Sequence, residues 1–432
     1  MILCILGRQP QIGLAELECV FGADALTPFS HEAALVDAEQ FSVERFGSII
    51  KAGVVVAEFS RVDWRTVSTK IIQHYSHEWR QNNGKQTLGI SVYGTSVAPR
   101  DVQKLGIVLK SRLKAHGVSL RLIPNQDQAL SSATSHHNKL GLAPNKTELL
   151  IAFSKNKVVV AESLGAQNIT ALAARDQGRP KRDAFVGMLP PKLALTMVNL
   201  ANDTNNEEPA NSAVSFSEDS AFPAAGPQDK TGRQLARPES EEKDDSGVSA
   251  STPTILDPFC GTGVLLQEAA LLGYNVYGTD LSEKMVDYSL ANLEWAKQKY
   301  RLSTTITIHH GDAIETKWQQ PIDAIASETY LGQPFSAPPS PTKLTQVRGN
   351  CNEIIKKFLT NLAPQIEKGI PLCLAVPAWR DAQGRFAHLP LISRLEELGY
   401  QPRPLRHVRH SDLIYYREDQ VVARQLLLLT RS

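Results

Sequence analysis

The chain has 432 residues, of which 42% are hydrophobic and 21% charged, and its formal net charge at pH 7 is +1. This length suits two or three domains, each with its own hydrophobic core. The five cysteines are scattered and form no Cys-x-x-Cys pair, so the sequence predicts neither a disulfide framework nor a zinc site. No apolar run reaches the length of a membrane span, and the short apolar N-terminus carries no basic leader, which together predict a cytoplasmic protein.

The N-terminal part of the chain divides into two predicted αβ units. Residues 1–60 alternate as strand, helix, strand, strand, helix and strand, with the second helix expected over 42–50. This order is the ferredoxin-like pattern. Residues 61–172 begin with a helix over 64–79 and continue with a strand, a helix over 100–116, another strand and a hairpin. Neither unit contains a catalytic constellation, which favours a role in binding or positioning.

Basic residues gather at two places in the sequence. The helix over 100–116 carries Lys104, Lys110, Arg112 and Lys114. The connecting segment, residues 173–201, contains a second group and then an apolar-periodic helix that ends at Leu200; the cations of this group are Arg179, Lys181, Arg182 and Lys192. Such a density of Lys and Arg can neutralise the phosphates of a nucleic acid, although a solvated helix face explains the first group equally well.

The segment 202–252 differs from the rest of the chain in charge and composition. Its core, residues 203–250, holds 11 acids and four bases, a net charge of −7, which leaves +8 for the remainder. The segment is rich in Ser, Pro, Asn and Ala and has almost no aliphatic periodicity. A sequence of this kind does not bury enough apolar surface to fold, so we predict a disordered acidic insert.

The most informative run begins the C-terminal part, residues 253–432. Residues 255–263 read Ile-Leu-Asp-Pro-Phe-Cys-Gly-Thr-Gly, which predicts a buried strand, a glycine turn and the start of a helix. A second strand ends on Asp280, 17 residues after Gly263, near the spacing at which an acid accepts both hydroxyls of a ribose. A third strand, over 305–313, contains Asp312, which suits an adenine amino group.

These residues predict a nucleoside cofactor, and the motifs that are missing argue against a dinucleotide and a nucleoside triphosphate. The turn lacks the third glycine of the dinucleotide fingerprint and the Gly-Lys-Ser/Thr of a P-loop. An acid before the turn, with no lysine to neutralise phosphate, suits a ligand that carries an ammonium and a sulfonium group, which describes S-adenosylmethionine. Another nucleotide-binding doubly wound fold is the alternative. The predicted cofactor-binding residues are Asp257, Phe259, Gly261, Gly263, Asp280 and Asp312.

Several ordered strings resemble one known family, the THUMP-domain tRNA guanosine-N2-methyltransferases of archaea and eukaryotes. The strings are Gly7-Arg8, Leu14-Ala15-Glu16-Leu17-Glu18, Arg179-Pro180-Lys181-Arg182, Leu189-Pro190-Pro191-Lys192-Leu193-Ala194, Val198-Asn199-Leu200, and residues 257–263. The resemblance covers nearly the whole chain. It implies an α/β fold in which a class I (Rossmann-like) methyltransferase domain follows a ferredoxin-like domain and a THUMP-like α+β RNA-binding domain.

The resemblance also implies a function. Members of the family methylate the exocyclic N2 amine of a guanosine in the D-arm region of tRNA, with S-adenosylmethionine as cofactor. We therefore expect tRNA as the partner, bound in part by Arg179, Lys181, Arg182 and Lys192. Some relatives need a small zinc-binding activator subunit, while no metal site is expected in this chain.

The sequence departs from the family at the catalytic signature, which is Asp-Pro-Pro-Tyr-Gly at the end of the fourth strand. Here residues 323–332 read Asp-Ala-Ile-Ala-Ser-Glu-Thr-Tyr-Leu-Gly. Anchoring on Asp323 and Gly332 places Glu328 at the family's acid, whereas anchoring on the aromatic aligns Ser327 with the acid and Tyr330 with the tyrosine. The first alignment keeps a charged acceptor for the amine and is preferred. Loss of both prolines leaves a catalytically degenerate RNA-binding relative as an alternative. An adenine-N6 methyltransferase, a class that uses a similar signature, is another alternative.

Further elements are expected after the signature. The stretch 333–350, rich in Pro, Ser and Thr, is predicted to be a substrate loop or lid. Helices are expected over 353–362 and 391–398. Strands over 413–416 and 421–429 should close the sheet as an antiparallel hairpin.

Overall fold

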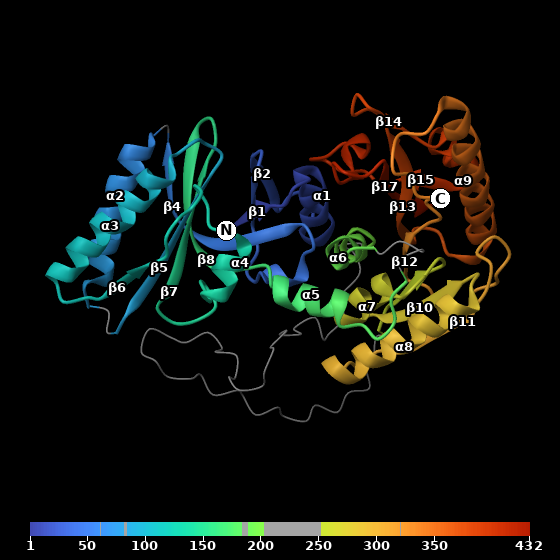
Figure 1. The fold of residues 1–432 in the computed structure, drawn as a ribbon, viewed down its shortest axis with the longest axis horizontal. Helices are drawn as coiled ribbons and strands as arrows, with labels where there is room; N and C mark the ends of the chain where they lie inside the picture. The colour runs from blue at the N-terminus through green and yellow to red at the C-terminus, as the bar shows by residue number, and fades with distance from the viewer. Residues whose placement is uncertain (61, 82–83, 184–188, 203–251, 320) are drawn as a thin grey trace.

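The computed structural model describes residues 1–60, 62–81, 84–183, 189–202, 252–319 and 321–432. Two sheets lie beside each other, with a group of helices between them (Figure 1). We call residues 1–166 the N-terminal half, residues 167–202 the connector, and residues 252–432 the C-terminal half. The predicted acidic insert, 202–252, lies outside the described residues except for its first and last positions.

Eight strands of the N-terminal half form a single sheet in the order β2-β3-β1-β4-β8-β7-β5-β6. Their bounds are β1 (Ile2–Leu6), β2 (Leu26–Ser30), β3 (Ala33–Val36), β4 (Ile49–Ser60), β5 (Gln86–Tyr93), β6 (Leu120–Leu122), β7 (Lys146–Phe153) and β8 (Lys157–Ala166). The helices of this half are α1 (Pro10–Phe21), α2 (Trp64–Glu78), α3 (Pro99–Ala115) and α4 (Ser132–His137). In Figure 1, α2 and α3 lie on the side away from the C-terminal half, and α1 lies on the side toward it.

Strand β4 joins the two predicted N-terminal units. It pairs antiparallel with β1 on one side and with β8 on the other, so the sheet continues across the expected boundary at residue 60. The helix predicted over 42–50 is wrong, because only a 3-10 turn forms there, at Val43–Arg45. Ile49 and Ile50 already belong to β4, where pairing with β1 on one edge and β8 on the other outweighs the local helical pattern.

A buried ion pair strengthens this junction. Lys51 of β4 pairs with Glu148 of β7, and both side chains are almost completely buried. The Lys51 ammonium also donates to the carbonyl of Leu130 at 2.7 Å, and Ser91 donates to Glu148 at 2.6 Å. Removing one partner of such a pair typically costs about 3–5 kcal/mol, so the network holds the two units in one arrangement.

The C-terminal half is a doubly wound sheet. Its main strands follow the order β11-β10-β9-β12-β13-β17-β15, in which the first five are parallel and β17 runs antiparallel to β13. The bounds are β9 (Thr254–Asp257), β10 (Asn275–Asp280), β11 (Ile306–His310), β12 (Ala324–Glu328), β13 (Pro371–Arg380), β14 (Phe386–Ala387), β15 (Tyr400–Pro402), β16 (Ile414–Tyr415) and β17 (Val422–Arg431). The longer helices are α7 (Val264–Leu271), α8 (Glu283–Tyr300) and α9 (Pro341–Leu362).

Two predicted elements of this half differ from the structure and one is confirmed. The expected loop over 333–350 is wrong in its second part, because α9 begins at Pro341, where Ser340 accepts a hydrogen bond from the Lys343 N–H. A serine N-cap followed by proline is a favoured helix start. The expected helix over 391–398 consists of two short 3-10 helices. The closing antiparallel hairpin is present, as β16 and β17.

The two halves share one hydrophobic core. Buried side chains of α1 and β1 pack in the same cluster as α6 (Pro191–Leu200) of the connector and the first strand and helix of the C-terminal half. Leu17, Leu193, Val198 and Leu266 are representative members, each at most 2% exposed. Helix α6 lies between the two sheets in Figure 1. The N-terminal half is therefore not a loosely tethered module.

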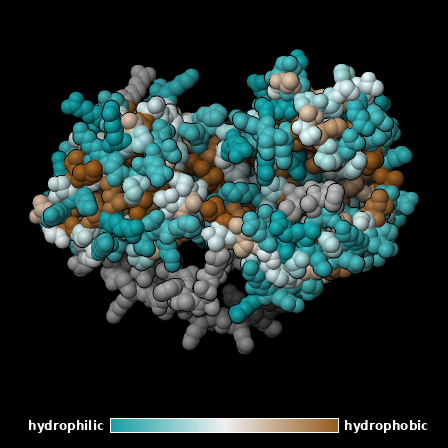
Figure 2. All heavy atoms as spheres, viewed as in Figure 1, coloured by the Kyte–Doolittle hydropathy of each residue, from teal (hydrophilic) through white to brown (hydrophobic). Residues whose placement is uncertain are grey.

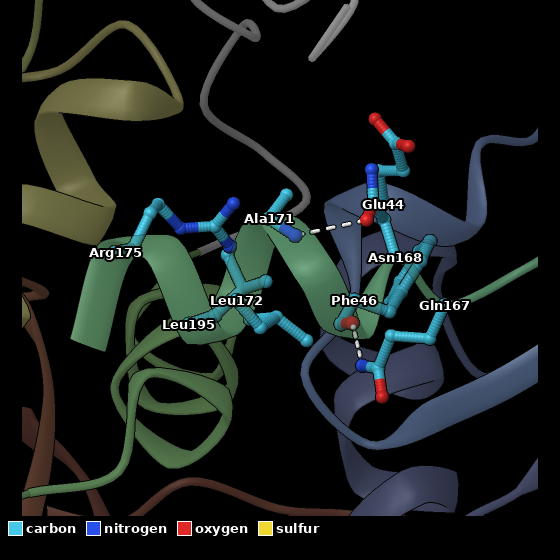
Figure 3. A pocket seen from close by; sticks show the side chains of 8 residues that line it. All are labelled: Glu44, Phe46, Gln167, Asn168, Ala171, Leu172, Arg175 and Leu195. Carbon is cyan, nitrogen blue, oxygen red and sulfur yellow. Dashed lines mark hydrogen bonds between the residues drawn. The ribbon is translucent and has the colours of Figure 1, made fainter. Parts of the chain in front are cut away.

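Helix α5 (Ile169–Gln177) also bridges the halves, as Figure 3 shows. At its start, Gln167 donates to the carbonyl of Phe46, and the Asn168 side chain accepts from the N–H of Ala171 at 2.9 Å. Near its end, Arg175 donates to Glu268 of α7 at 2.9 Å, and both side chains are buried.

Hydrophilic residues cover most of the face seen in Figure 2, and hydrophobic residues appear there as scattered patches. Within the described part of the chain, no helix combines the length and the apolar character that a membrane span requires.

Candidate functional site

The glycine turn after β9 lies at the carboxyl edge of the second sheet. Gly261 and Gly263 have φ angles of 51° and 78°, in the left-handed region that favours glycine. Gly263 is also the N-cap of α7, and a Cβ atom there would lie 2.5 Å from the hydroxyl oxygen of Ser289. Both backbone conformation and space therefore call for glycine in this turn.

Asp280, at the end of β10, holds the turn in place. Its Oδ2 accepts a hydrogen bond from the Gly261 N–H at 2.9 Å, and its Oδ1 accepts from the Ser282 N–H at 2.9 Å. Each oxygen of an ionised carboxylate can accept more than one hydrogen bond. Asp280 thus retains capacity for the hydroxyls of a ribose.

The connector supports the turn from its other side. Arg179 is only 4% exposed and donates to the Thr262 hydroxyl at 3.1 Å. Burial is the main cause that lowers the pKa of its guanidinium. Asn292 of α8 donates to the carbonyls of Thr262 and Lys181, at 2.8 and 2.9 Å. These contacts link the connector directly to the glycine turn.

A deep cleft opens in front of the turn and contains about 1760 Å³ of space free of atoms, part of it open to solvent. Its described lining includes four acids, which are Asp257, Asp280, Asp312 and Glu328, and no Lys or Arg. Apolar side chains complete the wall, among them Leu189 of the connector, Phe259 and Ile314. The cleft is therefore acidic and apolar.

This lining fits S-adenosylmethionine and does not fit a nucleoside triphosphate. Carboxylates in a lining that contains no Lys or Arg attract an ammonium and a sulfonium, whereas they repel a polyphosphate. The acids at the ends of β9, β10 and β11 follow one another along the sheet edge, which is where open α/β sheets bind ligands. Five of the six predicted cofactor residues line the cleft, and Gly263, the sixth, shapes the turn behind it.

Asp257 is the buried member of the acidic set. It is 2% exposed, and its Oδ1 accepts from the Ser327 hydroxyl at 2.6 Å and from the Phe259 N–H at 3.1 Å. Burial raises the pKa of Asp257 to about 7, and the nearby Asp280 and Glu328 add to the rise, while the two hydrogen bonds oppose it. Its charge consequently responds to pH near neutrality.

The two alternative catalytic residues point in different directions from β12. Ser327 is completely buried and is bound to Asp257. Glu328 lines the cleft and forms an ion pair with Arg424 of β17, in which the two side chains are 16% and 11% exposed. Neighbouring residues of a strand face opposite sides of the sheet, which is why one of them faces the cleft and the other the interior. Tyr330 also lines the cleft and is 46% exposed.

Arg424 was not predicted from the sequence, although a signal for it exists. It stands beside Gln425 in the strand Val422–Arg431, whose other central residues are leucines and alanine. A charged residue inside such an apolar strand needs a partner, and here the partner is Glu328.

The four predicted RNA-binding residues lie in three different environments. Arg179 is buried against the glycine turn, so its side chain is not presented to a phosphate at the surface. Lys181 and Arg182 are exposed, and the Lys181 ammonium lies 5.6 Å from the centre of the Tyr288 ring. Lys192 is partly buried, in a different cleft that is described below. Nothing in the described residues forms a cluster of His, Cys, Asp and Glu that could hold a metal ion.

The sheet order, the glycine turn after the first strand and the antiparallel last strand together define a Rossmann-like methyltransferase domain. Residues 246–357 match the model of the UPF0020 family, described as an RMKL-like methyltransferase domain. TrmN from Thermus thermophilus has a similar overall fold, with a TM-score of 0.50 and 14% identity over 100% of this chain and 99% of that one. These matches confirm the predicted α/β fold with a Rossmann-like methyltransferase domain.

Two curated relatives are similar in sequence over part of their length. The tRNA (guanine(10)-N2)-dimethyltransferase of Methanothermobacter thermautotrophicus is 30% identical over 138 residues, which make up 32% of this chain and 37% of that protein. The enzyme of the same name from Pyrococcus abyssi is 33% identical over 139 residues, 31% of this chain and 37% of that protein. The matches thus span little more than a third of these relatives. They confirm the resemblance to tRNA guanosine-N2-methyltransferases that the sequence strings indicate.

Proposed function

We propose that the protein transfers a methyl group from S-adenosylmethionine to the exocyclic N2 amine of a guanosine in tRNA. The observation that carries this proposal is the acidic cleft at the sheet edge, in which Glu328 faces the cofactor site and is held by Arg424. The similarity to two proteins named tRNA (guanine(10)-N2)-dimethyltransferase supports the choice of substrate.

Three of the four acids of the cleft have a proposed role in binding the cofactor. Asp280 accepts the ribose hydroxyls, as its position at the end of the second strand suggests. Asp312, whose Oδ1 accepts from the Ile314 N–H at 3.1 Å, accepts the adenine amino group with its remaining capacity. The buried Asp257 stabilises the ammonium end through its charge.

The chemistry requires that a weak nucleophile be oriented. The cofactor supplies a methyl group on a sulfonium, and the sulfur retains the electron pair of the broken bond. The lone pair of the guanine amine is delocalised into the ring, so an acceptor that holds the amine in line contributes through positioning and charge stabilisation. Glu328 accepts a hydrogen bond from this amine and receives the proton that the nitrogen loses when the new bond forms.

The ion pair leaves Glu328 suited to this role. Its Oε1 is bound to Arg424, while Oε2 has no hydrogen-bond partner among the described residues. The pair fixes the direction of the carboxylate and leaves one oxygen for the substrate. Tyr330 is exposed at the mouth of the cleft. It stacks on the guanine base once this base has flipped out of the RNA helix.

Two finer points of the proposal concern partners and location. A small zinc-binding activator subunit is included as a possible requirement because the resembled family contains members that need one. We place the protein in the cytoplasm, where tRNA is processed and where its five unpaired cysteines would stay reduced.

The direct test is methyl transfer to unmodified tRNA. Purified full-length protein is incubated with labelled S-adenosylmethionine and transcribed tRNA, with and without a zinc-binding activator subunit, and the nucleosides are then separated. We expect N2-methylguanosine or N2,N2-dimethylguanosine. Cofactor binding without transfer to any tRNA would instead support an RNA-binding protein that retains the methyltransferase fold, and N6-methyladenosine as product would overturn the choice of guanosine.

A further inference from the structure

A second cleft lies where the two halves meet, and it shares no lining residue with the cofactor cleft. Three segments that are distant in sequence supply its charged lining, namely the loop between β1 and α1, the first turn of α6, and the loop between β16 and β17, while Gly47, Ser48 and Ile50 also line it. Each segment contributes one cation, namely Arg8, Lys192 and Arg417. Asp419 is the one acid in the described lining, so the cleft carries an excess of positive charge.

Within the described parts of the chain, these three cations have no partner. Among the described residues, none of the three side chains takes part in a hydrogen bond or an ion pair, although the structure forms many such pairs elsewhere. Burial lowers the pKa of the Lys192 ammonium, and no acid opposes this effect. Arg8 and Arg417 are exposed and Lys192 is partly buried, and unpaired cations that line one cleft are suited to an anionic ligand.

The walls of the cleft are held together by direct contacts, so the backbone segments that carry the cations are fixed before a ligand arrives. The Gly7 N–H donates to the carbonyl of Ser48 at 2.8 Å. The Gln9 side chain donates to the carbonyl of Tyr416 at 2.8 Å, which ties the residue after Arg8 to the residue before Arg417.

The start of α6 also packs closely against the neighbouring wall of this cleft. A Cβ atom on Gly47 would lie 1.9 Å from the carbonyl oxygen of Lys192, so the backbone of α6 rests directly on this glycine. Helices α1 and α6 both begin at the cleft, and neither start is capped by a side chain. Their free N–H groups add partial positive charge to that of the three side chains.

The connector links this cleft to the cofactor cleft. Leu189 lines the cofactor cleft, and Lys192, three residues later, lines the second one. A polymer that carries a phosphate at every residue can occupy both clefts at once, with one nucleotide at the methyl-transfer site and a backbone phosphate on the cations. A free phosphate ion would gain nothing from this adjacency.

We propose that the cleft formed by Arg8, Lys192 and Arg417 binds a backbone phosphate of the RNA substrate and thereby sets which nucleotide reaches the cofactor cleft. This inference rests on the proposed tRNA substrate. Guanidinium groups bind phosphate through paired N–H donors, and the ammonium adds a point charge.

The test compares two triple variants that remove the same charge. R8Q/K192Q/R417Q alters the cleft, and K356Q/K357Q/K368Q removes three exposed lysines of α9 and the turn after η3 (Ala363–Gln365). Equilibrium tRNA binding is measured over a range of salt concentrations. For the cleft variant we expect a loss of at least about tenfold in affinity and a salt slope smaller by roughly 1 to 3, because each lost phosphate contact lowers the slope by about 1. The α9 variant should change little.

Three further measurements keep the interpretation clear. Thermal unfolding and S-adenosylmethionine binding should be unchanged in both variants, since the cleft is separate from the cofactor site. In the cleft variant, K192R in place of K192Q should restore part of the tRNA affinity. Equal losses in the two triple variants would overturn the proposal. The proposal would also be overturned if inorganic phosphate stabilised the wild type against unfolding while R8Q/K192Q/R417Q bound tRNA like wild type. Selective loss of tRNA binding in a protein that methylates no tRNA would refute the proposed function and leave the phosphate-binding part of this inference standing.

Discussion

Ser327 donates its hydroxyl to Oδ1 of Asp257 over 2.6 Å, and this bond joins the strand that carries the proposed acceptor to the strand that carries the cofactor turn. The two residues lie on neighbouring parallel strands, β12 and β9. Ser327 therefore acts on the charge of the cofactor site, whereas its neighbour Glu328 faces the substrate.

The first prediction concerns pH and stability without cofactor. The folded pKa of Asp257, about 7, lies above the ordinary value of 3.8, so between these values the folded state holds one more proton than the unfolded state. Stability that is fully present below the lower value is then lost as pH rises toward the upper one. D257N lacks this loss, so relative to wild type it should gain roughly 2 kcal/mol of unfolding free energy between pH of about 5 and 8.

Denaturant unfolding at the two pH values measures this difference. S327A provides a matched variant, because loss of a hydrogen bond that lowers the pKa of Asp257 should extend the pH window upward. A D257N effect of the same size at both pH values would show that Asp257 ionises normally in the folded protein.

The second prediction concerns Asp280. D280A should weaken S-adenosylmethionine binding by about 1–3 kcal/mol, because a charged acceptor for the ribose hydroxyls is lost and the Gly261 N–H loses its partner. Titration calorimetry measures the change. D287A, at an exposed position on α8, is the control and should bind the cofactor like wild type. Unchanged affinity in D280A would reject the ribose assignment.

The third prediction concerns the carboxylate of Glu328. E328Q keeps the size of the side chain and removes the charge, so single-turnover methyl transfer should slow by roughly 10- to 1000-fold while cofactor affinity hardly changes. S327A should slow the same step only slightly, because Ser327 is buried against Asp257. The opposite ranking of the two rates would assign the acceptor role to Ser327.

The fourth prediction concerns the exposed basic face of α3. K104Q/K110Q/K114Q should weaken tRNA binding and reduce its salt slope by about 1 for each lysine that contacts a phosphate. Filter binding at several salt concentrations measures both quantities, with K356Q/K357Q/K368Q again as control. Substitution is preferable to removal of residues 1–172, since truncation would also strip α1 from the shared core. An unaltered slope would show that α3 is a solvated face.

The fifth prediction concerns the acidic segment. Asn202 and Pro253 line the same small pocket, so the chain leaves and re-enters the described structure at one place. Replacing residues 203–250 by a short Gly-Ser linker should therefore preserve the fold, because the closure entropy of a loop depends only weakly on its length. Affinity for tRNA should stay the same or rise, since a net charge of −7 is removed. A neutral Gly-Ser replacement of full length separates charge from length, and reduced affinity in both variants would contradict the prediction.

Local patterns were sufficient to predict much of the C-terminal half. The glycine turn, the acids that end successive strands and the closing hairpin were predicted because turn residues and hydrophobic periodicity act over a few residues. The pairing of β4 with β8 joins residues about a hundred positions apart, and nothing in either strand specifies its partner. The two N-terminal units consequently looked separate.

The site was predicted in part for the same reason. Asp257, Asp280 and Asp312 follow strands whose order can be inferred, so their convergence was predictable. Arg424 lies 96 positions after Glu328, and its role depends on the antiparallel placement of β17 next to β13. Arg179 illustrates the opposite error: a basic run suggested a phosphate contact, and the structure buries this member of the run against Thr262.

The common core of α1, α6 and the second sheet limits how this fold can be rearranged. A methyltransferase domain excised at residue 252 would expose the apolar surface that α1 and α6 cover, and it would lose the Arg179 contact that supports its own glycine turn. Recombination with a different N-terminal module would have to carry α1, α5 and α6 along with the second sheet. The unit that can be exchanged intact is thus larger than the methyltransferase domain, because residues of β1 to β4 also belong to the shared core.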